Sequence, residues 1–495
     1  MTHGYEMRGS YTAEKNPAQA RFGRIFPKAA VGKSWPDPAA LGKRGGPMDQ
    51  GTSHGQTPAP DGALGTQDNP SIPAAFTYLG QFIDHDITLD PTSSLERQND
   101  PEATRNFRTA NLELDNLYGA GPASHPFLYD RTRPGRFLLG TLQGGDPADP
   151  AQRMDLPRNA QDVALIGDPR NDENLIVSQL HLAFLRFHNA VMDDIDIGLG
   201  DDGFSADEGK FDRAQRLVRW HYQWLVLKHF LPATVGPGVV EDVLQNGRKL
   251  YDPNNKAEEA FIPVEFSVAA YRFGHSQVQP GYLVNPGFGA GLFPGVINAP
   301  IVPRSDLRGG PLSAREVVNW NLFIDTGLPR GGGTRFSALI NEKLVAPLLN
   351  LPLSVVPVLS LPDGDPQRSL ATRNLMRAAA FELPSGAEAV AEANRLGVNI
   401  PLVPSAQIWS GDLQPFASHD VPLWFYVLRE AAVLADGKHL GPLGGRIVAE
   451  VLIGLLQKDP ISFLVAKPDW KPMFGRVTGD FDLVDLLRKA GMAGT

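Results

Sequence analysis

Residues 173–195 read ENLIVSQLHLAFLRFHNAVMDDI and carry the clearest helical pattern in the chain. Their apolar side chains recur at steps of three and four residues, the spacing that places them on one face of an α-helix. The same spacing begins again at about residue 73. Five further segments are predicted to be helical, namely 211–231, 315–323, 368–380, 420–434 and 444–457.

Alternation of apolar and polar residues, which is typical of half-buried β-strands, is scarce and confined to short runs. The chain contains 51 Gly and 43 Pro, and these residues interrupt regular elements and mark turns and loops. We therefore expect a mainly α fold with long ordered loops and little β structure.

Residues 71–495 show no repeat of fixed period and no linker, so they are predicted to form one large domain. Residues 1–70 are rich in Gly, Pro, Asp and Gln, which makes them too polar and too interrupted for a core. We expect an extended arm that lies over the main body, with a disordered tail as the alternative.

The composition excludes several classes of protein. A chain of 495 residues with 42% hydrophobic and 20% charged residues is typical of a soluble globular protein. The net charge of −9 and the lack of a dense Lys/Arg cluster argue against a nucleic-acid-binding protein. Because the chain has no cysteine, disulfides, iron–sulfur clusters and a thiolate haem ligand are excluded.

Features that would direct the chain to a membrane are not evident in the sequence. No run of about eighteen apolar residues could span a bilayer. The first residues contain no apolar run of the kind found in signal peptides. We expect a soluble protein that is cytoplasmic or secreted by a route independent of a signal peptide.

Residues 80–86 read GQFIDHD and place Asp84, His85 and Asp86 in the helix predicted from residue 73. Burying such groups is costly unless each is paired or binds a metal ion. A solvent-exposed helix face would explain the same triplet, so this motif alone leaves both interpretations open.

Residues 109–115 read TANLELD, with oxygen donors at every second position. An extended loop of this kind can turn its donors toward one hard cation, and Ca²⁺ accepts about six to eight oxygen ligands. The alternative is an edge strand with one polar face.

Three other segments combine polar residues in unusual places. Residues 167–174, GDPRNDEN, lead into the long helix, and a positive charge at Arg170 is disfavoured near a helix start. Residues 270–276, AYRFGHS, hold a histidine that could be a core residue or a ligand. Residues 373–377, RNLMR, would line one helix with basic and amide groups, which a solvated face also explains.

In this order along the chain, the motifs resemble those of the myeloperoxidase–cyclooxygenase superfamily, the animal haem peroxidases. The strings that carry the resemblance are LGQFIDHDIT, RTANLELDNLYG, GDPRNDEN followed by LHLAFLRFHN, and AYRFGHSQVQP. The resemblance covers about residues 70–460, and the N-terminal arm has no part in it. It implies a haem peroxidase domain over 71–495.

The resemblance implies haem b as the cofactor and assigns the residues on its two faces. On the proximal side, His275 resembles the iron ligand and Asn374 the amide that accepts its ring N–H. On the distal side, His85 resembles the acid–base histidine and Arg170 the distal arginine. Gln81 resembles the glutamine that binds distal water and helps to hold a halide.

Further roles follow from the same resemblance. Arg377 and Arg373 are implied to face a haem propionate. Asp84 and Glu173 stand where the mammalian enzymes form ester bonds to the haem. The implied calcium ligands are Asp86, Thr109, Asn111 through its carbonyl, Glu113 and Asp115.

The sequence also departs from the family pattern. Asn174 stands where myeloperoxidase has a methionine bonded to a haem vinyl group, so no sulfonium link can form. Glu113 replaces the usual Asp among the calcium ligands, and the lack of cysteine suggests a bacterial-type member. The implied reaction reduces hydrogen peroxide through an oxyferryl intermediate and oxidises halides, thiocyanate or small organic donors.

The main alternative is a fatty-acid dioxygenase of the cyclooxygenase type. These enzymes need a radical-forming tyrosine three residues before the proximal histidine, where this chain has Arg272. Tyr271 is adjacent, but one residue of helix turns a side chain by about 100°. The resemblance therefore favours a peroxidase.

Two alternatives lie outside the superfamily. A non-haem metalloenzyme could use pairs of histidines that are seven or eight residues apart, His181 with His188 or His221 with His229. Helical metal ligands usually lie three or four residues apart, which disfavours this interpretation. A calcium-stabilised module without catalysis is disfavoured by the joint presence of the distal and proximal motifs.

Overall fold

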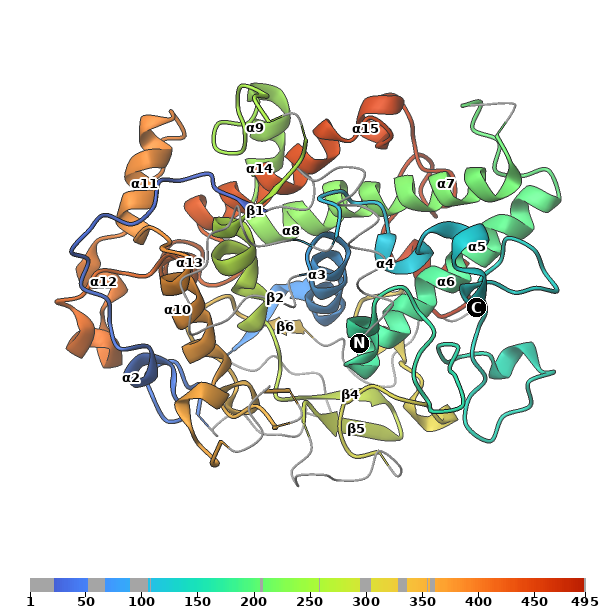
Figure 1. Ribbon diagram of the computed structural model, residues 1–495, viewed down its shortest axis with the longest axis horizontal. Helices are drawn as coiled ribbons and strands as arrows, with labels where there is room; N and C mark the ends of the chain where they lie inside the picture. The colour runs from blue at the N-terminus through green and yellow to red at the C-terminus, as the bar shows by residue number, and fades with distance from the viewer. Residues whose placement is uncertain are drawn as a thin grey trace.

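Three helices, α3 (Ala74–Ile87), α6 (Leu175–Asp196) and α7 (Lys210–Leu225), pack against one another in the computed structural model (Figure 1). The structure describes residues 22–51, 67–89, 106, 108–204, 208–257, 259–293, 304–327, 336–353, 355–356 and 361–493. Asn174 begins α6, because its side chain accepts the N–H of Ile176 at 2.9 Å.

An aromatic cluster joins the three helices. Phe82 of α3 stacks on Phe184 of α6 with ring centroids 4.6 Å apart. Tyr222 of α7 meets both rings edge-on, at 6.3 Å and 5.7 Å. Because all three side chains are fully buried, this contact fixes the position of α3, the helix that carries the 80–86 motif.

Most of the remaining regular structure is helical. The other α-helices are α2 (Pro38–Gly42), α4 (Asp115–Tyr118), α5 (Gly121–Ser124), α8 (Leu231–Val235), α9 (Val239–Asn246), α10 (Leu370–Ala380), α11 (Gly386–Arg395), α12 (Ser405–Ile408), α13 (Leu423–Ala435), α14 (Pro442–Lys458), α15 (Phe463–Ala466) and α16 (Leu483–Lys489). Short turns that matter for the site are η3 (Pro169–Asp172), the π-helical η5 (Glu265–Ala269) and η6 (Ala270–His275).

Strand structure among the described residues is limited to three two-stranded sheets. β1 (Phe22–Gly23) pairs in parallel with β3 (Ile262–Pro263). The antiparallel pairs are β2 (Asp68–Pro73) with β6 (Phe336–Ala338), and β4 (Gly281–Asn285) with β5 (Phe288–Gly291). The expected mainly α fold with little β structure is confirmed.

The expected helix over 315–323 is wrong. The segment forms two short 3₁₀ turns, η7 (Ala314–Glu316) and η8 (Trp320–Leu322). Val317 is extended, with ψ 129°, which ends the first turn. Asn319 then begins the second turn by accepting the N–H of Asn321 at 3.1 Å. A local side-chain hydrogen bond thus replaces the helical one.

The expected helix over 211–231 is real but not regular. α7 passes at Val226–Phe230 into the π-helical turn η4 and then into α8. Pro232 lies in the first turn of α8, and because proline has no N–H it cannot donate to the carbonyl of Lys228. The segments 368–380, 420–434 and 444–457 correspond to α10, α13 and α14 within a few residues.

The described part of the N-terminal region, residues 22–51, lies against the main body. β1 pairs with β3, and α2 packs on α10 (Figure 1). Phe26, Leu41 and Met48 are buried. Residues 1–21 and 52–66 of the expected arm lie outside the described residues.

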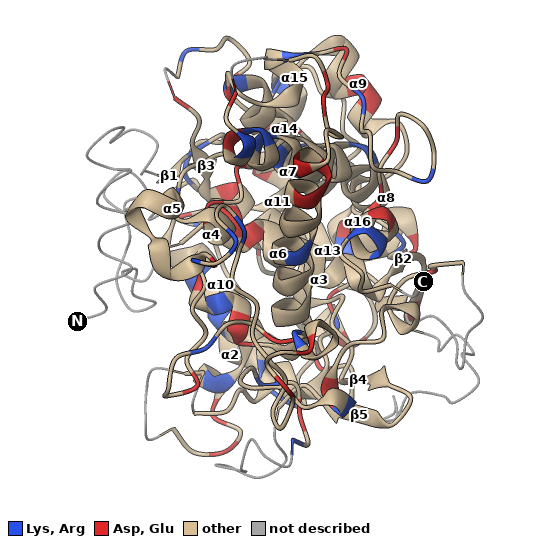
Figure 2. Cartoon of the chain, turned by 90° about the vertical axis from the view of Figure 1, so that its right-hand side faces the viewer, with Lys and Arg blue, Asp and Glu red and all other residues tan. Residues whose placement is uncertain are grey.

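Charged residues of both signs are distributed along the chain. Figure 2 shows basic and acidic positions interspersed on the side of the molecule that it presents. Within the residues that the structure describes, none of the helices is long and apolar enough to cross a membrane.

Candidate active site

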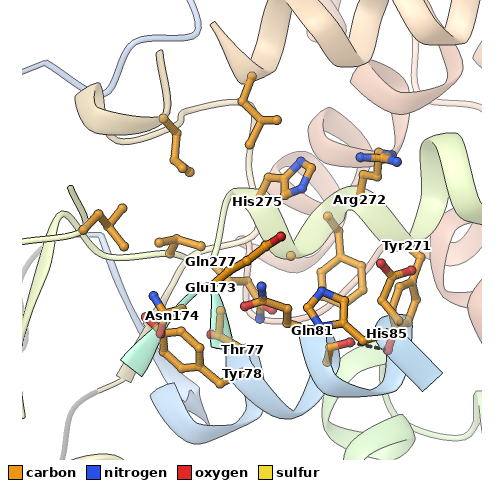
Figure 3. A pocket seen from close by; sticks show the side chains of 18 of the residues that line it. Thr77, Tyr78, Gln81, His85, Glu173, Asn174, Tyr271, Arg272, His275 and Gln277 are labelled. Carbon is orange, nitrogen blue, oxygen red and sulfur yellow. Dashed lines mark hydrogen bonds between the residues drawn. The ribbon is translucent and has the colours of Figure 1, made fainter. Parts of the chain in front are cut away.

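One cavity of about 580 Å³ lies between α3 and η6, and both His85 and His275 line it (Figure 3). The two imidazoles come from segments 190 positions apart in the sequence, and Figure 3 shows them on facing walls. Gln81, Asp84 and Glu173 also line this cavity. The fold therefore brings together five of the residues that the sequence motifs singled out.

The spacing within α3 explains how one helix supplies three of these groups. Gln81, Asp84 and His85 lie three and four residues apart, so they share one helix face. Asp84 is held in place by Thr88, whose hydroxyl donates to the Asp84 carboxylate at 3.0 Å. Asp86, one position further on, does not line the cavity and is fully buried.

His85 is held by an amide from the segment before α6. Its Nδ1 lies 2.7 Å from Oδ1 of Asn171, and Nδ2 of Asn171 lies 2.9 Å from Nδ1 of His181. Burial, followed by the charge of Arg170, lowers the pKa of His85 to about 4. The imidazole is therefore neutral near pH 7 and can accept a proton.

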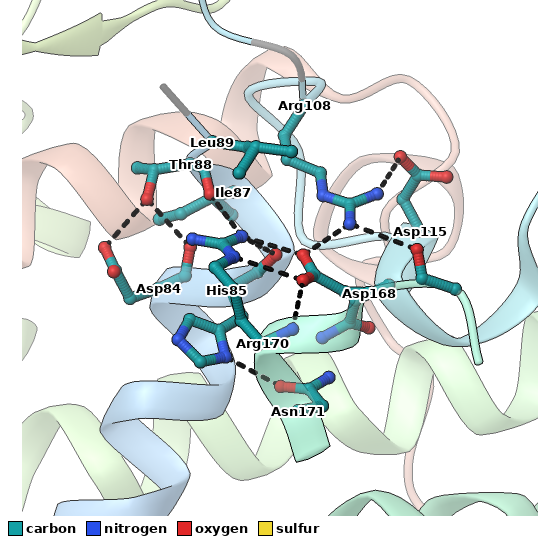
Figure 4. Close-up of polar contacts among 12 residues, drawn as sticks. Asp84, His85, Ile87, Thr88, Leu89, Arg108, Asp115, Asp168, Arg170 and Asn171 are labelled. Atoms are coloured by element: carbon teal, nitrogen blue, oxygen red, sulfur yellow. Dashed lines mark hydrogen bonds and ion pairs between the residues drawn. The ribbon is translucent and has the colours of Figure 1, made fainter. Parts of the chain in front are cut away.

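Arg170 is near His85 but does not line the cavity. Its Nη2 donates to the backbone carbonyls of His85 at 3.0 Å and Thr88 at 2.6 Å (Figure 4). Its Nε and Nη2 also contact the two oxygens of Asp168, at 3.1 Å and 2.8 Å. These bonds tie Arg170 to the C-terminal end of α3 and do not use its Nη1.

Asp168 is shared between two arginines. It is fully buried and pairs with both Arg170 and Arg108. Burial alone would raise the pKa of Asp168, but the charges of Arg170 and Arg108 outweigh it and hold that pKa far below its usual range. Arg108 continues the network to Asp115, which it contacts at 3.3 Å (Figure 4).

The turn η3 is fixed residue by residue. Asp168 begins it by accepting the N–H of Arg170 at 3.0 Å. Asp172 ends it in a two-pronged ion pair with Arg158, with distances of 2.6 Å and 2.9 Å. Asn171 stands between these anchors, which explains why its side chain reaches the two histidines in one orientation.

His275, at the end of η6, is held by α10. Nδ2 of Asn374 lies 2.8 Å from Nδ1 of His275, which leaves Nε2 for the cavity. As placed, the amide nitrogen donates to Nδ1, whereas rotation of the amide about its terminal bond would bring its oxygen there to accept the ring N–H, as the resemblance implies. Burial, and then Arg272, lowers the pKa of His275 to about 3. The ring is neutral, as a metal ligand must be.

Arg373 and Arg377, which the resemblance implied to face a haem propionate, are partly buried on α10 and are not among the residues that line the cavity. Arg272 and Arg308 do line it. Nothing in the sequence pattern around Arg308 pointed to this role, because its position depends on pairing between residues 174 and 308.

Glu173 and Asn174 line the same cavity from the start of α6. Burial raises the pKa of Glu173, although Arg170 acts in the opposite direction. Gly309 donates its N–H to the carbonyl of Glu173 at 3.0 Å, which fixes this segment against residues 304–310. Asp84 and Glu173 therefore reach one cavity from two different elements.

The residues of the expected calcium site are only partly assembled. Asp86 accepts the N–H of Leu114 on Oδ2 at 3.1 Å. Its Oδ1 makes no hydrogen bond of normal geometry, although the Tyr222 hydroxyl is a close neighbour. Burial, with the charges of Asp115 and Glu113 among the further causes, raises the pKa of Asp86 to about 7. A buried carboxylate in this setting fits a cation.

Other contacts hold the remaining donors. The Thr109 hydroxyl donates to the carboxylate of Glu113, and Asp115 is paired with Arg108. Asn111 is partly exposed. Among the described residues there is no group of three or more His, Asp or Glu side chains arranged to hold a metal ion.

Comparison with known proteins indicates the family and the fold. Residues 94–288 match the family model described as animal haem peroxidase. The chain is 26% identical over 186 residues to a peroxidasin homolog of Caenorhabditis briggsae, which is 35% of this chain and 14% of that protein. The chain thus matches only about a seventh of the length of that relative. The range matched by the family model, residues 94–288, includes His275 but not α3, the helix that carries His85.

Solved structures extend the similarity over the whole chain. Peroxidase A from Dictyostelium discoideum superposes with a TM-score of 0.60 at 16% identity, covering 97% of this chain and 96% of that one. Fatty acid alpha-dioxygenase from Oryza sativa superposes with a TM-score of 0.52 at 13% identity, covering 99% and 88%. At these identities the similarity defines the fold alone.

The comparisons agree on one class of protein. Residues 94–288 are similar to the animal haem peroxidase family, and the whole chain shares its fold with a peroxidase and with a fatty acid alpha-dioxygenase. Members of this class are haem-dependent oxidoreductases.

Proposed function

We propose that this chain is a haem peroxidase that reduces hydrogen peroxide and oxidises halides, thiocyanate or small organic donors. The observation that carries the proposal is the pairing of two buried, neutral imidazoles, His85 and His275, across one cavity. Each imidazole has its Nδ1 held by an amide, which leaves its Nε2 for the cavity. One imidazole can ligate iron while the other serves the reacting peroxide.

The cavity fits haem in size and chemistry. Part of its wall is apolar, as a macrocycle requires, and is lined by residues that include Val278, Leu292, Phe293, Leu348 and Leu370. We assign Nε2 of His275 as the iron ligand and the Asn374 amide as the group that orients its ring. Bound haem would supply the redox equivalents, and the protein would supply orientation and electrostatics.

On the distal side, His85 is the proposed acid–base group. With Nδ1 bonded to Asn171, its Nε2 can take a proton from one peroxide oxygen and return it to the departing oxygen. Positioned acid–base catalysis of this kind contributes ~10²–10⁴-fold in rate. Gln81, one turn earlier on α3, can hold water or a small anion beside the same position.

Arg170 contacts the backbone of His85 but does not line the cavity. Its charge helps to keep His85 neutral, and its bonds to the His85 and Thr88 carbonyls hold the end of α3. We propose that it also contributes to the stabilisation of negative charge as the peroxide bond breaks, through Nη1, which these bonds leave available. Arg272 and Arg308 are better placed than Arg373 or Arg377 to meet a haem carboxylate.

The proposed donor specificity rests on Asn174, which stands where myeloperoxidase has a methionine. Asn174 lines the cavity where a methionine could form a sulfonium link, an attachment that would withdraw electrons from haem. Without it, the oxidising power should be lower. We therefore propose that iodide, bromide, thiocyanate and small organic compounds are oxidised, with chloride a poor donor at neutral pH.

The proposal also includes ester bonds to haem and a calcium ion. Asp84 and Glu173 both reach the cavity and are the proposed sites of ester bonds to haem. Calcium is proposed to bind at Asp86 with donors from residues 109–115, supported by the unbonded Oδ1 of Asp86. A cation there would link the helix that carries His85 to the loop before α4.

A fatty-acid dioxygenase is the second candidate, because the fold is also that of the Oryza sativa enzyme. Against it, Arg272 stands three residues before His275, where a radical-forming tyrosine would be needed. Tyr271 also lines the cavity, but its hydroxyl donates to the Gly80 carbonyl at 3.2 Å. A peroxidase is therefore favoured.

One pair of assays separates the two candidates. The haem-loaded protein is given hydrogen peroxide with iodide, and separately palmitate with dissolved oxygen. A peroxidase consumes about one peroxide for each two-electron oxidation of donor and takes up no oxygen with palmitate. Oxygen uptake that requires palmitate and no peroxide-dependent iodide oxidation would reverse the assignment.

A further inference from the structure

We propose that Asn171 is a positioning residue that couples His85 to His181 and fixes the tautomer in which His85 carries its proton on Nδ1. The inference rests on the proposed peroxidase function for its catalytic meaning, but its structural content is the state of three side chains. Those side chains come from α3, η3 and α6 and meet in the interior behind the cavity.

The hydrogen bonds define the coupling. In the orientation that the structure gives the Asn171 amide, Oδ1 accepts from a proton on Nδ1 of His85 at 2.7 Å, and the reversed amide would exchange the roles of the two rings. Nδ2 of Asn171 is a donor, so the contact of 2.9 Å requires a lone pair on Nδ1 of His181. The amide nitrogen can only donate and the amide oxygen faces the other ring, so Nδ1 is protonated on one imidazole and unprotonated on the other.

The consequence for His85 lies at its other nitrogen. A neutral imidazole with a proton on Nδ1 has an unprotonated Nε2. His85 lines the cavity, so this lone pair is the group that a peroxide proton would meet. In the opposite tautomer Nε2 would carry a proton and could not act as a base. Asn171 thus keeps His85 ready for the first proton transfer.

The surroundings keep the amide in place without depending on it. Asp168, Arg170 and Asp172 each anchor the same turn by ion pairs or by hydrogen bonds to other elements. Asn171 is fully buried, as is His181. Loss of the Asn171 side chain should therefore remove this hydrogen bond from both imidazoles while the backbone of η3 remains held.

Two substitutions at this position make opposite demands on the histidines. In Asn171→Asp the ionised carboxylate accepts from both rings, so His85 keeps its Nδ1 proton and His181 changes to the Nδ1–H tautomer. In Asn171→Leu both rings lose the amide, so the His85 tautomer is no longer set by this hydrogen bond. Asn189→Leu is the matched control, because that buried amide of α6 bonds only to the backbone of Phe137.

The test is ¹⁵N NMR of histidine-labelled protein, with haem in its diamagnetic ferrous carbonyl form and in parallel without haem. The ring signals are assigned with His85→Gln and His181→Gln variants. The expected result is Nδ1–H for His85 and Nε2–H for His181 in the wild type, a changed His181 tautomer in Asn171→Asp, and a mixed His85 state in Asn171→Leu. This spectrum is independent of turnover, so its failure is distinguishable from failure of the peroxidase assignment.

The second readout is the bimolecular rate constant for hydrogen peroxide, measured by stopped flow. Asn171→Leu should lose at least about tenfold and no more than the ~10²–10⁴-fold that a positioned base contributes, and Asn171→Asp should lose less. Asn189→Leu should keep the wild-type rate. The proposal is overturned by Nε2–H on His85 in the wild type, by an unchanged His181 tautomer in Asn171→Asp, or by Asn171→Leu retaining both tautomer and rate.

Discussion

Asp168 and Arg170 form a two-pronged ion pair, with Nε–Oδ1 at 3.1 Å and Nη2–Oδ2 at 2.8 Å, at the C-terminal end of α3. The same carboxylate is paired with Arg108. The network links the loop before α4, the turn before α6 and the helix that carries His85. It places two positive charges on one buried carboxylate.

Replacement of this carboxylate should be strongly destabilising. Asp168→Ala leaves Arg108 and Arg170 without their shared partner, and removal of one member of a buried pair costs about 3–5 kcal/mol. Lys438→Ala, which removes the partner of Asp436 in an ion pair whose two side chains are both solvent-exposed, is the control and should cost under about 1 kcal/mol. Urea unfolding gives both values. Equal losses for the two variants would contradict the proposed importance of the network.

Calcium should stabilise the wild type through Asp86. We expect about one calcium ion per chain in protein never exposed to chelator, and a lower Tm after chelation. Asp86→Asn keeps a hydrogen-bonding group beside Leu114 but loses the charge, so its Tm should no longer respond to calcium. The absence of calcium from the untreated wild type, or an equal calcium response in both proteins, would remove the site.

Haem should become covalently attached after treatment with small amounts of hydrogen peroxide. Denaturing mass spectrometry should show haem on the chain. Asp84→Val and Glu173→Gln should each remove one bond, and the double variant should release free haem. Release of all haem from the peroxide-treated wild type into acidic solvent would rule out the esters but not the peroxidase assignment.

The stability of the fold should depend on pH through Glu430. This side chain accepts the N–H groups of Leu443 and Gly444 at the start of α14, and burial raises its pKa from 4.5 to about 7. A raised folded-state pKa stabilises the protein below pH 4.5, and that contribution is lost as pH rises through about 7.

Glu430→Gln tests this contribution because the amide does not titrate. As pH rises from about 5 to about 8, the wild type loses this contribution and the variant does not. The free energy of unfolding of the variant should therefore rise relative to that of the wild type by up to about 3 kcal/mol. Glutamine has only one side-chain oxygen, which changes the stability of the variant by the same amount at both pH values. That amount cancels when the two pH values are compared. Glu241→Gln, at an exposed position of α9, is the control. A difference that is independent of pH would show that Glu430 is not protonated at the lower pH.

The sequence was sufficient for the central helices and for the groups that face the cavity from one helix. The period of three and four residues identifies α3 and α6, and it places Gln81, Asp84 and His85 on one face. It failed at 315–323, where Asn319 restarts the chain as a separate turn through a side-chain hydrogen bond. Local patterns describe the helix face but not such competing bonds.

Local sequence patterns could not predict the hydrogen bonds that hold the two histidines of the cavity. Asn171 meets a histidine 86 positions earlier in the chain, and Asn374 meets one 99 positions earlier. Such contacts follow from the packing of α3, α6 and α10, which periodicity does not specify. Arg170 illustrates the limit, because the motif indicated its proximity to His85 but not that its guanidinium would bind Asp168 and two carbonyls.

The central claim is that His275 holds haem and His85 handles peroxide. The most direct measurement is the stopped-flow absorption spectrum of the haem-loaded protein before and after one equivalent of hydrogen peroxide. We expect a Soret band in the wild type that changes rapidly on mixing. His275→Ala should largely lose haem, and His85→Ala should keep it but react ~10²–10⁴-fold more slowly. A wild type that binds no haem, or variants that keep normal haem occupancy and an undiminished peroxide rate, would contradict the account.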